Sequence, residues 1–93
     1  MFTDPSFRMM VEDVFVIRGR GVVVTGQIKI GEIRVGNEVY IHGSGETRTA
    51  VINSIEMFHR RQQRAQAGDR VGLILAGISK EEVQPGDALL GTA

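Results

Sequence analysis

The stretch FRMMVEDVFVIRGRGVVVTGQIKI, residues 7–30, decides the fold class, because apolar and polar residues alternate along it on both sides of a glycine-rich turn. Period-two alternation of β-branched residues is typical of half-buried strands. The pattern predicts one bent strand over Phe7–Arg18 and an antiparallel partner over Val22–Ile30. The segment RGRG forms the turn between them. Gly26 interrupts the second strand, where we expect a bulge or a barrel bend.

The rest of the chain repeats this pattern of short apolar runs between turn residues. Further strands are expected at Glu32–Val35, Glu38–His42, Thr47–Met57, 70–77 and 88–91, with turns at Gly31, Gly36-Asn37 and residues 43–46. The arginine-rich segment His59–Gln66 has no apolar stripe and is predicted to be a surface loop. Ser79 and Glu82 have the spacing of a capping box, which indicates a short helical turn, and Pro85-Gly86 fits a type II turn.

Short strands without a long helix predict an all-β fold. The two architectures that suit about six to seven strands of this length are a closed antiparallel β-barrel and a small sandwich. The glycines inside the strands favour the barrel, since a closed sheet must bend. We expect an N-terminal arm over residues 1–6, the barrel over 7–91, and a C-terminal end over 92–93.

Composition narrows the class of protein further. The chain has 93 residues, a formal net charge of zero and no cysteine. This length accommodates a single small core, and the absence of cysteine excludes disulfides and thiolate zinc sites. Without net positive charge, any contact with nucleic acid must be local. Asp4 and Pro5 stand where a signal peptide would be apolar, so we expect a soluble, cytoplasmic protein with no membrane contact.

Signatures of catalysis and of cofactor binding are missing from the sequence. It contains no GxxxxGK[ST] loop, and Gly19-x-Gly21 lies between two strands instead of before a helix, so we expect no nucleotide cofactor. His42 and His59 are not at metal-ligand spacing, and we predict no metal. The sequence therefore indicates a protein that is not an enzyme.

Two adjacent acids stand out in the first strand. Alternation places Glu12 with Val14 on one face and Asp13 with Phe15 on the other, so these carboxylates are not expected to act as a pair. Two interpretations remain open. Either both acids lie at the barrel rim and are satisfied by turn amides or arginines, or one of them lines a site.

Three blocks of the sequence resemble the second domain of elongation factor Tu and its relatives among translational GTPases. They are VEDVFVIRGRGVVVTGQIKIGEIRVGNEVYI (11–41), IEMFHRR (55–61) and AGDRVGLILAGISKEEVQPGDALL (67–90), in the family's order and spacing, and the likeness runs from Phe7 to Leu90. The resemblance implies a closed antiparallel barrel that helps to bind the aminoacylated 3′ end of tRNA. The family's GTPase domain and third domain are not represented, so we do not expect this chain to bind GTP itself.

The same resemblance implies which residues meet the RNA end. The acid of the EMF block, Glu56, resembles the residue that contacts the terminal ribose. The apolar pocket for the terminal adenine is implied at Ile17, Gly19, Val23 and Ile74. The lining of the aminoacyl group is implied at Glu12, Asp13, Phe15 and Thr25. Apolar walls with one carboxylate suit an unpaired adenosine, because single-stranded ends are recognised by stacking and by edge and hydroxyl contacts.

Several features depart from the family pattern, and two of them concern the implied site. His59 stands where arginine is usual, and Arg70 stands where asparagine is common. A long cation at Arg70 changes the size and charge of the implied aminoacyl pocket. The residues that we consider candidates for RNA or partner contacts are His59, Arg60, Arg61, Arg64 and Arg70.

Two functions follow from these observations and remain open. The first is a non-catalytic, translation elongation factor-like barrel, excised or free-standing, that binds the tRNA 3′ end or a partner such as a translation factor or ribosomal protein. The second is a protein–protein interaction barrel that has lost tRNA binding. A third use of the barrel, like that in some oxidoreductases or ribosomal proteins, has no particular residue to support it.

Overall fold

A computed structural model describes residues 6–43 and 45–91. Within these ranges the chain forms nine strands and one short 3₁₀ helix. Their bounds are β1 (Phe7–Met10), β2 (Asp13–Ile17), β3 (Gly21–Arg34), β4 (Glu38–His42), β5 (Arg48–Met57), β6 (Arg60–Gln62), β7 (Arg64–Gln66), β8 (Arg70–Ala76), η1 (Lys80–Glu82) and β9 (Ala88–Gly91). Apart from Ser6, the predicted arm over 1–6 and the predicted end over 92–93 lie outside the described residues.

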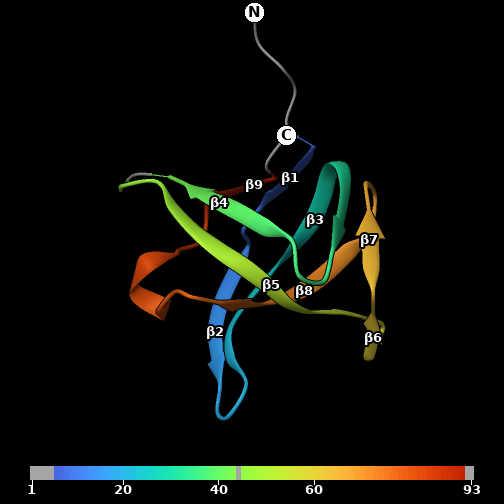
Figure 1. The fold of residues 1–93 in the computed structure, drawn as a ribbon, viewed down its shortest axis with the longest axis horizontal. Coiled ribbons are helices and arrows are strands. Elements are labelled where there is room, and N and C mark those ends of the chain that lie inside the picture. Colours follow the sequence, from blue (N-terminus) through green and yellow to red (C-terminus); the bar gives the residue numbers. More distant parts are fainter. Residues whose placement is uncertain (1–5, 44, 92–93) are drawn as a thin grey trace, which may run out of the picture.

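Six strands close into an antiparallel barrel, which confirms the predicted fold. The strands follow one another in the order β1-β9-β4-β5-β8-β3, and the ring closes because β1 also pairs with β3. Strand β2 continues the sheet beyond β3, while β6 pairs with β5 and β7 pairs with β3. In Figure 1 the hairpin of β2 and β3 projects from one end of the barrel, and β1 and β9 meet near the other end.

The barrel interior is filled by alternate residues of the strands. Those with 2% exposure or less include Phe7, Met9, Val24, Ile28, Ile33, Val39, Ile41, Ile52, Ile55, Leu73 and Leu89. Gly26 allows β1 to approach β3 closely, since a Cβ there would lie 2.3 Å from the carbonyl oxygen of Met10. The register between β1 and β3 shifts between Arg8 and Met9 of β1, and not at Gly26.

The prediction of one bent strand over Phe7–Arg18 is wrong. Strand β1 ends at Met10, and β2 begins at Asp13. Between them the buried Val11 donates its N–H to the carbonyl oxygen of Asp87 at 2.8 Å. This contact holds the chain between β1, which belongs to the ring, and β2, which lies outside it.

The expected turn at Gly31 is also absent, because β3 runs without interruption from Gly21 to Arg34. Gly31 has φ of 76°, and a Cβ there would lie only 1.8 Å from the carbonyl oxygen of Ser6. Glycine therefore permits the close approach of β1 to β3 at the point where they pair, and the strand continues through it.

The segment His59–Gln66, predicted to be a loop, forms the short strands β6 and β7. Strand β6 pairs with the end of β5, and β7 pairs with the end of β3. Ala65 is buried, so this arginine-rich segment does place one apolar side chain inside. An apolar residue as small as alanine gives no visible stripe, and backbone pairing with two distant strands decides the structure instead.

The turns near the end of the chain follow the sequence signals. Glu82 accepts hydrogen bonds from the backbone and hydroxyl of Ser79, which is the predicted capping box at η1. Gly86 has φ of 97°, and the N–H of Asp87 donates to the carbonyl of Gln84, as a type II turn at Pro85-Gly86 requires. Among the described residues, no helix has the length and apolar character needed to cross a membrane.

Candidate functional site

The candidate site lies on the outer face of the sheet formed by β2, β3, β8 and β5. Strand register places one row of residues across it, since Asp13 pairs with Thr25, Thr25 with Gly72, and Gly72 with Glu56. The next residue along β8, Leu73, is buried in the barrel core. Because successive side chains of a strand point to opposite faces, the row itself faces outward.

A second row, two residues further along the strands, supplies an apolar floor. Phe15 pairs with Val23, and Val23 pairs with Ile74. Val23 and Ile74 are only 5% and 3% exposed, yet neither belongs to the core cluster inside the barrel. They are therefore buried apolar side chains on the outer face of the sheet, and the half-exposed Phe15 lies beside them.

These rows border a hollow of about 500 Å³. Seven of the nine residues implied for the RNA end line it: Glu12, Asp13, Phe15, Ile17, Val23, Thr25 and Glu56. His59 and Arg70, from the second group of candidates, line it as well. The strand register thus brings together residues from three distant parts of the chain.

Glu12 and Asp13 border the same hollow, although strict alternation would place their side chains on opposite faces. Asp13 is the strand partner of Thr25, and the N–H of Glu12 also donates to the carbonyl of Thr25, at 2.8 Å. Two residues opposite one is the arrangement of a β-bulge, which redirects a side chain. Both interpretations left open find support here, because the two acids border the hollow and Arg70 pairs with Glu12.

Gly72 keeps the middle of the hollow open. It separates Thr25 from Glu56 in the outward row. A Cβ added there would meet only a methyl carbon of Val23, at 4.0 Å. The space above Gly72 is thus free of protein atoms at the centre of the candidate site, and sequence reasoning did not single this glycine out.

An ion pair borders the hollow on the side of β2. The guanidinium of Arg70 lies 2.5 Å from the carboxylate of Glu12, and both side chains are well exposed. The resemblance placed both residues near the aminoacyl group. In this chain the two side chains contact each other, so Arg70 satisfies one of the acids that border the hollow.

A second ion pair holds Glu56, the acid implied for the terminal ribose. Its carboxylate lies 2.5 Å from the guanidinium of Arg20, with each side chain 34% exposed. Arg20 lies in the turn between β2 and β3, and sequence reasoning missed it as a site residue. The signal was its place in RGRG, but nothing in the sequence pairs it with a residue 36 positions away.

Two implied residues, Gly19 and Ile74, line a neighbouring hollow of about 290 Å³. Its other walls come from Arg20, Val35, Asn53, Ser54, Arg61, Gln62 and Gln63. The adenine pocket implied by the resemblance is thus divided between two adjacent hollows. They are related through Val23 and Ile74, which are strand partners but border different hollows.

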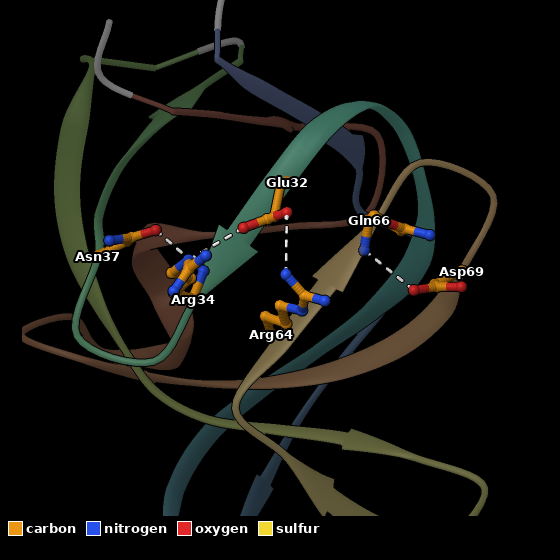
Figure 2. A network of polar contacts seen from close by, with 6 residues as sticks. All are labelled: Glu32, Arg34, Asn37, Arg64, Gln66 and Asp69. Atoms are coloured by element: carbon orange, nitrogen blue, oxygen red, sulfur yellow. Dashed lines mark hydrogen bonds and ion pairs between the residues drawn. The ribbon is translucent and has the colours of Figure 1, made fainter.

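The predicted basic patch is split by the strands. Arg61 pairs with Glu56 in register and borders the second hollow, whereas Arg60 stands at the β5–β6 turn. Arg64 lies elsewhere, beside β3, with its guanidinium 3.9 Å from the carboxylate of Glu32. Figure 2 shows Glu32 between Arg34 and Arg64, a polar network on the β3–β7 side of the barrel.

A comparison with known protein families identifies the family of this chain. The family model of elongation factor Tu domain 2 matches residues 21–90 of the 93-residue chain. The chain belongs to the elongation factor Tu domain 2 family. It is therefore a barrel module of the translation-factor type, as the three blocks implied.

The match to elongation factor Tu domain 2 begins at Gly21, the first residue of β3. Glu56, Thr25 and Val23 fall inside the matched range, while β2 and the bulge before it precede that range.

Within the described part of the chain, no three His, Asp or Glu side chains are grouped so that they could hold a metal ion.

Proposed function

We propose that this barrel binds the 3′-terminal adenosine of a single-stranded RNA, such as the CCA end of a tRNA. The observation that carries the proposal is the carboxylate of Glu56 at the edge of a hollow that Gly72 leaves open and Val23 floors with apolar atoms. An adenine ring would lie against the apolar floor. The ribose hydroxyls would donate hydrogen bonds to Glu56.

The energies involved set the expected affinity. Stacking one base contributes about 1–3 kcal/mol. A hydrogen bond to a charged group contributes about 1.5–3 kcal/mol. The sum lies near the ~4.1 kcal/mol of a millimolar complex. Free adenosine therefore binds weakly, and higher affinity requires further contacts with the same RNA or a partner that holds it.

We further propose that the RNA end is bound without an amino acid attached. The support is the contact between Arg70 and Glu12, which occupies the part of the hollow where the resemblance places the aminoacyl group. The free α-amino group of an aminoacyl ester carries a positive charge, which the Arg70 guanidinium repels. An uncharged 3′ hydroxyl meets no such repulsion.

The test is an NMR titration of the ¹⁵N-labelled protein with a short RNA ending in CCA, in unacylated and aminoacylated forms. We expect the amides of Val23, Glu56 and Gly72 to shift with the unacylated RNA at millimolar concentration. The aminoacylated RNA should produce smaller shifts at equal concentration. If the amides around Glu56 and Val23 do not move with either RNA, the proposed function is wrong.

A second candidate function, docking of a protein partner, is favoured by β2. Phe15 and Val16 on this strand are 42% and 53% exposed, and among the described strands β2 pairs only with β3. Exposed β-branched and aromatic residues on an edge strand suit the addition of a further strand from a partner. A nuclease-resistant protein complex that is lost with Val16→Lys would support this function, whereas recovery of RNA alone would count against it.

A further inference from the structure

The turn between β5 and β6 has an unusual backbone for its sequence. Met57 pairs with Arg60, so Phe58 and His59 alone form the loop of a two-residue hairpin. Their φ angles are 55° and 63°, and they are the only residues other than glycine with positive φ in the described ranges. Positive φ at both positions is the mark of a type I′ turn.

This turn type strongly prefers Asn-Gly, because glycine and asparagine tolerate the left-handed conformation. A phenylalanine and a histidine there place a Cβ close to the backbone, and both positions are strained. Residues in such conformations are concentrated at binding sites, where the surrounding structure holds them. The sequence at Phe58-His59 therefore sacrifices stability that Asn-Gly would supply.

The strained turn presents an aromatic ring to solvent. Phe58 is 86% exposed, more than any other large apolar side chain described. It borders the hollow of about 500 Å³ together with Met57 and His59. The ring thus stands at the rim of the hollow in which we place the terminal adenosine.

Positive charge follows the Phe58-His59 turn. Arg60 and Arg61 come next in the chain, both are exposed, and 57–66 contains no acidic residue. An exposed aromatic ring next to cations suits a single-stranded nucleic acid, whose bases stack and whose phosphates are negative. A pocket on a protein partner would accept the ring but would not explain the neighbouring arginines.

We propose that the β5–β6 turn is a second stacking point for RNA, on which Phe58 holds the base that precedes the terminal adenosine, while Arg60 meets its phosphate. This inference rests on the proposed function, since it extends the path of the bound RNA out of the hollow. It also supplies the additional contact that one captured adenosine lacks. Because every base has a π face, this contact should be largely independent of the identity of the base.

The test compares adenosine with a short RNA ending in CCA, for the unmodified protein and two variants. The double variant Phe58→Asn with His59→Gly introduces the preferred turn sequence and removes the ring. We expect it to raise Tm by roughly 5–15 °C. It should weaken binding of the RNA by about 5- to 150-fold and should weaken binding of free adenosine less.

The matched control is Phe58→Trp with His59→Gly, which makes the same change at His59 but keeps an aromatic ring at position 58. It should bind the RNA about 5- to 150-fold more tightly than the double variant with asparagine, so that the difference between the two proteins reports the ring alone. If the double variant with asparagine binds the RNA as tightly as the unmodified protein, the stacking point is wrong, and the ring serves a protein contact or none. If the unmodified protein binds neither adenosine nor RNA, the proposed function itself fails, and the stacking point fails with it.

Discussion

A larger side chain at Gly72 should weaken RNA binding without lowering stability, and the structure predicts the size of both effects. Gly72 lies inside β8, and it is not among the glycines with positive φ, so a side chain there causes no backbone strain. The Cβ of a new residue would meet only Val23, at an ordinary contact distance of 4.0 Å. The variant Gly72→Leu therefore extends its side chain into the hollow without displacing protein atoms at its base.

The expected magnitudes follow from this geometry. Replacing glycine inside a strand removes an entropic cost of about 0.5–1 kcal/mol, so Gly72→Leu should be as stable as the unmodified protein or slightly more stable. The side chain occupies the place of the adenine ring, and the lost stacking of about 1–3 kcal/mol weakens RNA binding by about 5- to 150-fold. Gly72→Ala should have an intermediate effect, since it adds only the first carbon.

Gly26→Ala is the matched control within the same sheet. A Cβ at Gly26 would lie 2.3 Å from the carbonyl oxygen of Met10, so the backbone must move. Overpacking of this kind costs about 1–3 kcal/mol. Urea denaturation of the two variants, followed by calorimetric titration with the CCA-ended RNA, measures both effects. The reasoning is refuted if folded Gly72→Leu binds the RNA with unchanged affinity, or if Gly26→Ala is as stable as Gly72→Ala.

Two further predictions concern ion pairs. Arg70→Asn releases Glu12 and should raise the affinity for aminoacylated RNA relative to unacylated RNA in the same titration. Because the pair is exposed, the free energy of unfolding should change by at most about 1 kcal/mol. An unchanged ratio of the two affinities would exclude Arg70 as the residue that disfavours the aminoacyl group. Hydrogen bonds from Ser79, and to a smaller extent the charge of Arg48, lower the pKa of Glu82 below its ordinary value of 4.5, so the ionised form stabilises the fold above that pH and the contribution disappears as pH falls below it. Thermal melts should show the unmodified protein to be more stable than Glu82→Gln at pH 7, with the difference closing below pH 4.5, and a difference that is independent of pH would contradict this.

Much of the fold is accessible from local patterns in the sequence. Strand β4 has the predicted bounds of Glu38–His42, because clear turn signals flank five alternating residues. The closed barrel is also correct, since several short strands with interior glycines leave few other ways to bury one core. Local alternation and turn chemistry are sufficient where a strand begins and ends at a turn.

The errors arise where contacts between distant segments override the local pattern. Gly31 has the sequence signal of a turn, yet it permits the chain near Ser6 to approach a continuous strand closely. The segment His59–Gln66 lacks any periodicity, and its two short strands depend on partners in β5 and β3. Neither the close approach at Gly31 nor the strand partners of His59–Gln66 are encoded in the few residues that a local pattern covers.

The candidate site shows the same division. The resemblance implied Glu56, Val23 and Thr25 together, and the structure places all three around one hollow. The resemblance missed the contact of Arg20 with Glu56, which depends on how a turn folds over the sheet. A side-chain contact over such a distance in sequence requires the three-dimensional structure.

The most direct measurement concerns the contact between Glu56 and the ribose hydroxyls. The dissociation constant is measured for one RNA with a free 3′ hydroxyl and for the same RNA with a 3′ phosphate, using the unmodified protein and Glu56→Gln. We predict that the unmodified protein binds the free end at least about 10-fold more tightly, since the phosphate removes a donor and is repelled by the carboxylate. Glu56→Gln should abolish most of this preference. Equal affinity of the unmodified protein for the two RNAs would contradict the proposal that the barrel recognises an RNA 3′ end.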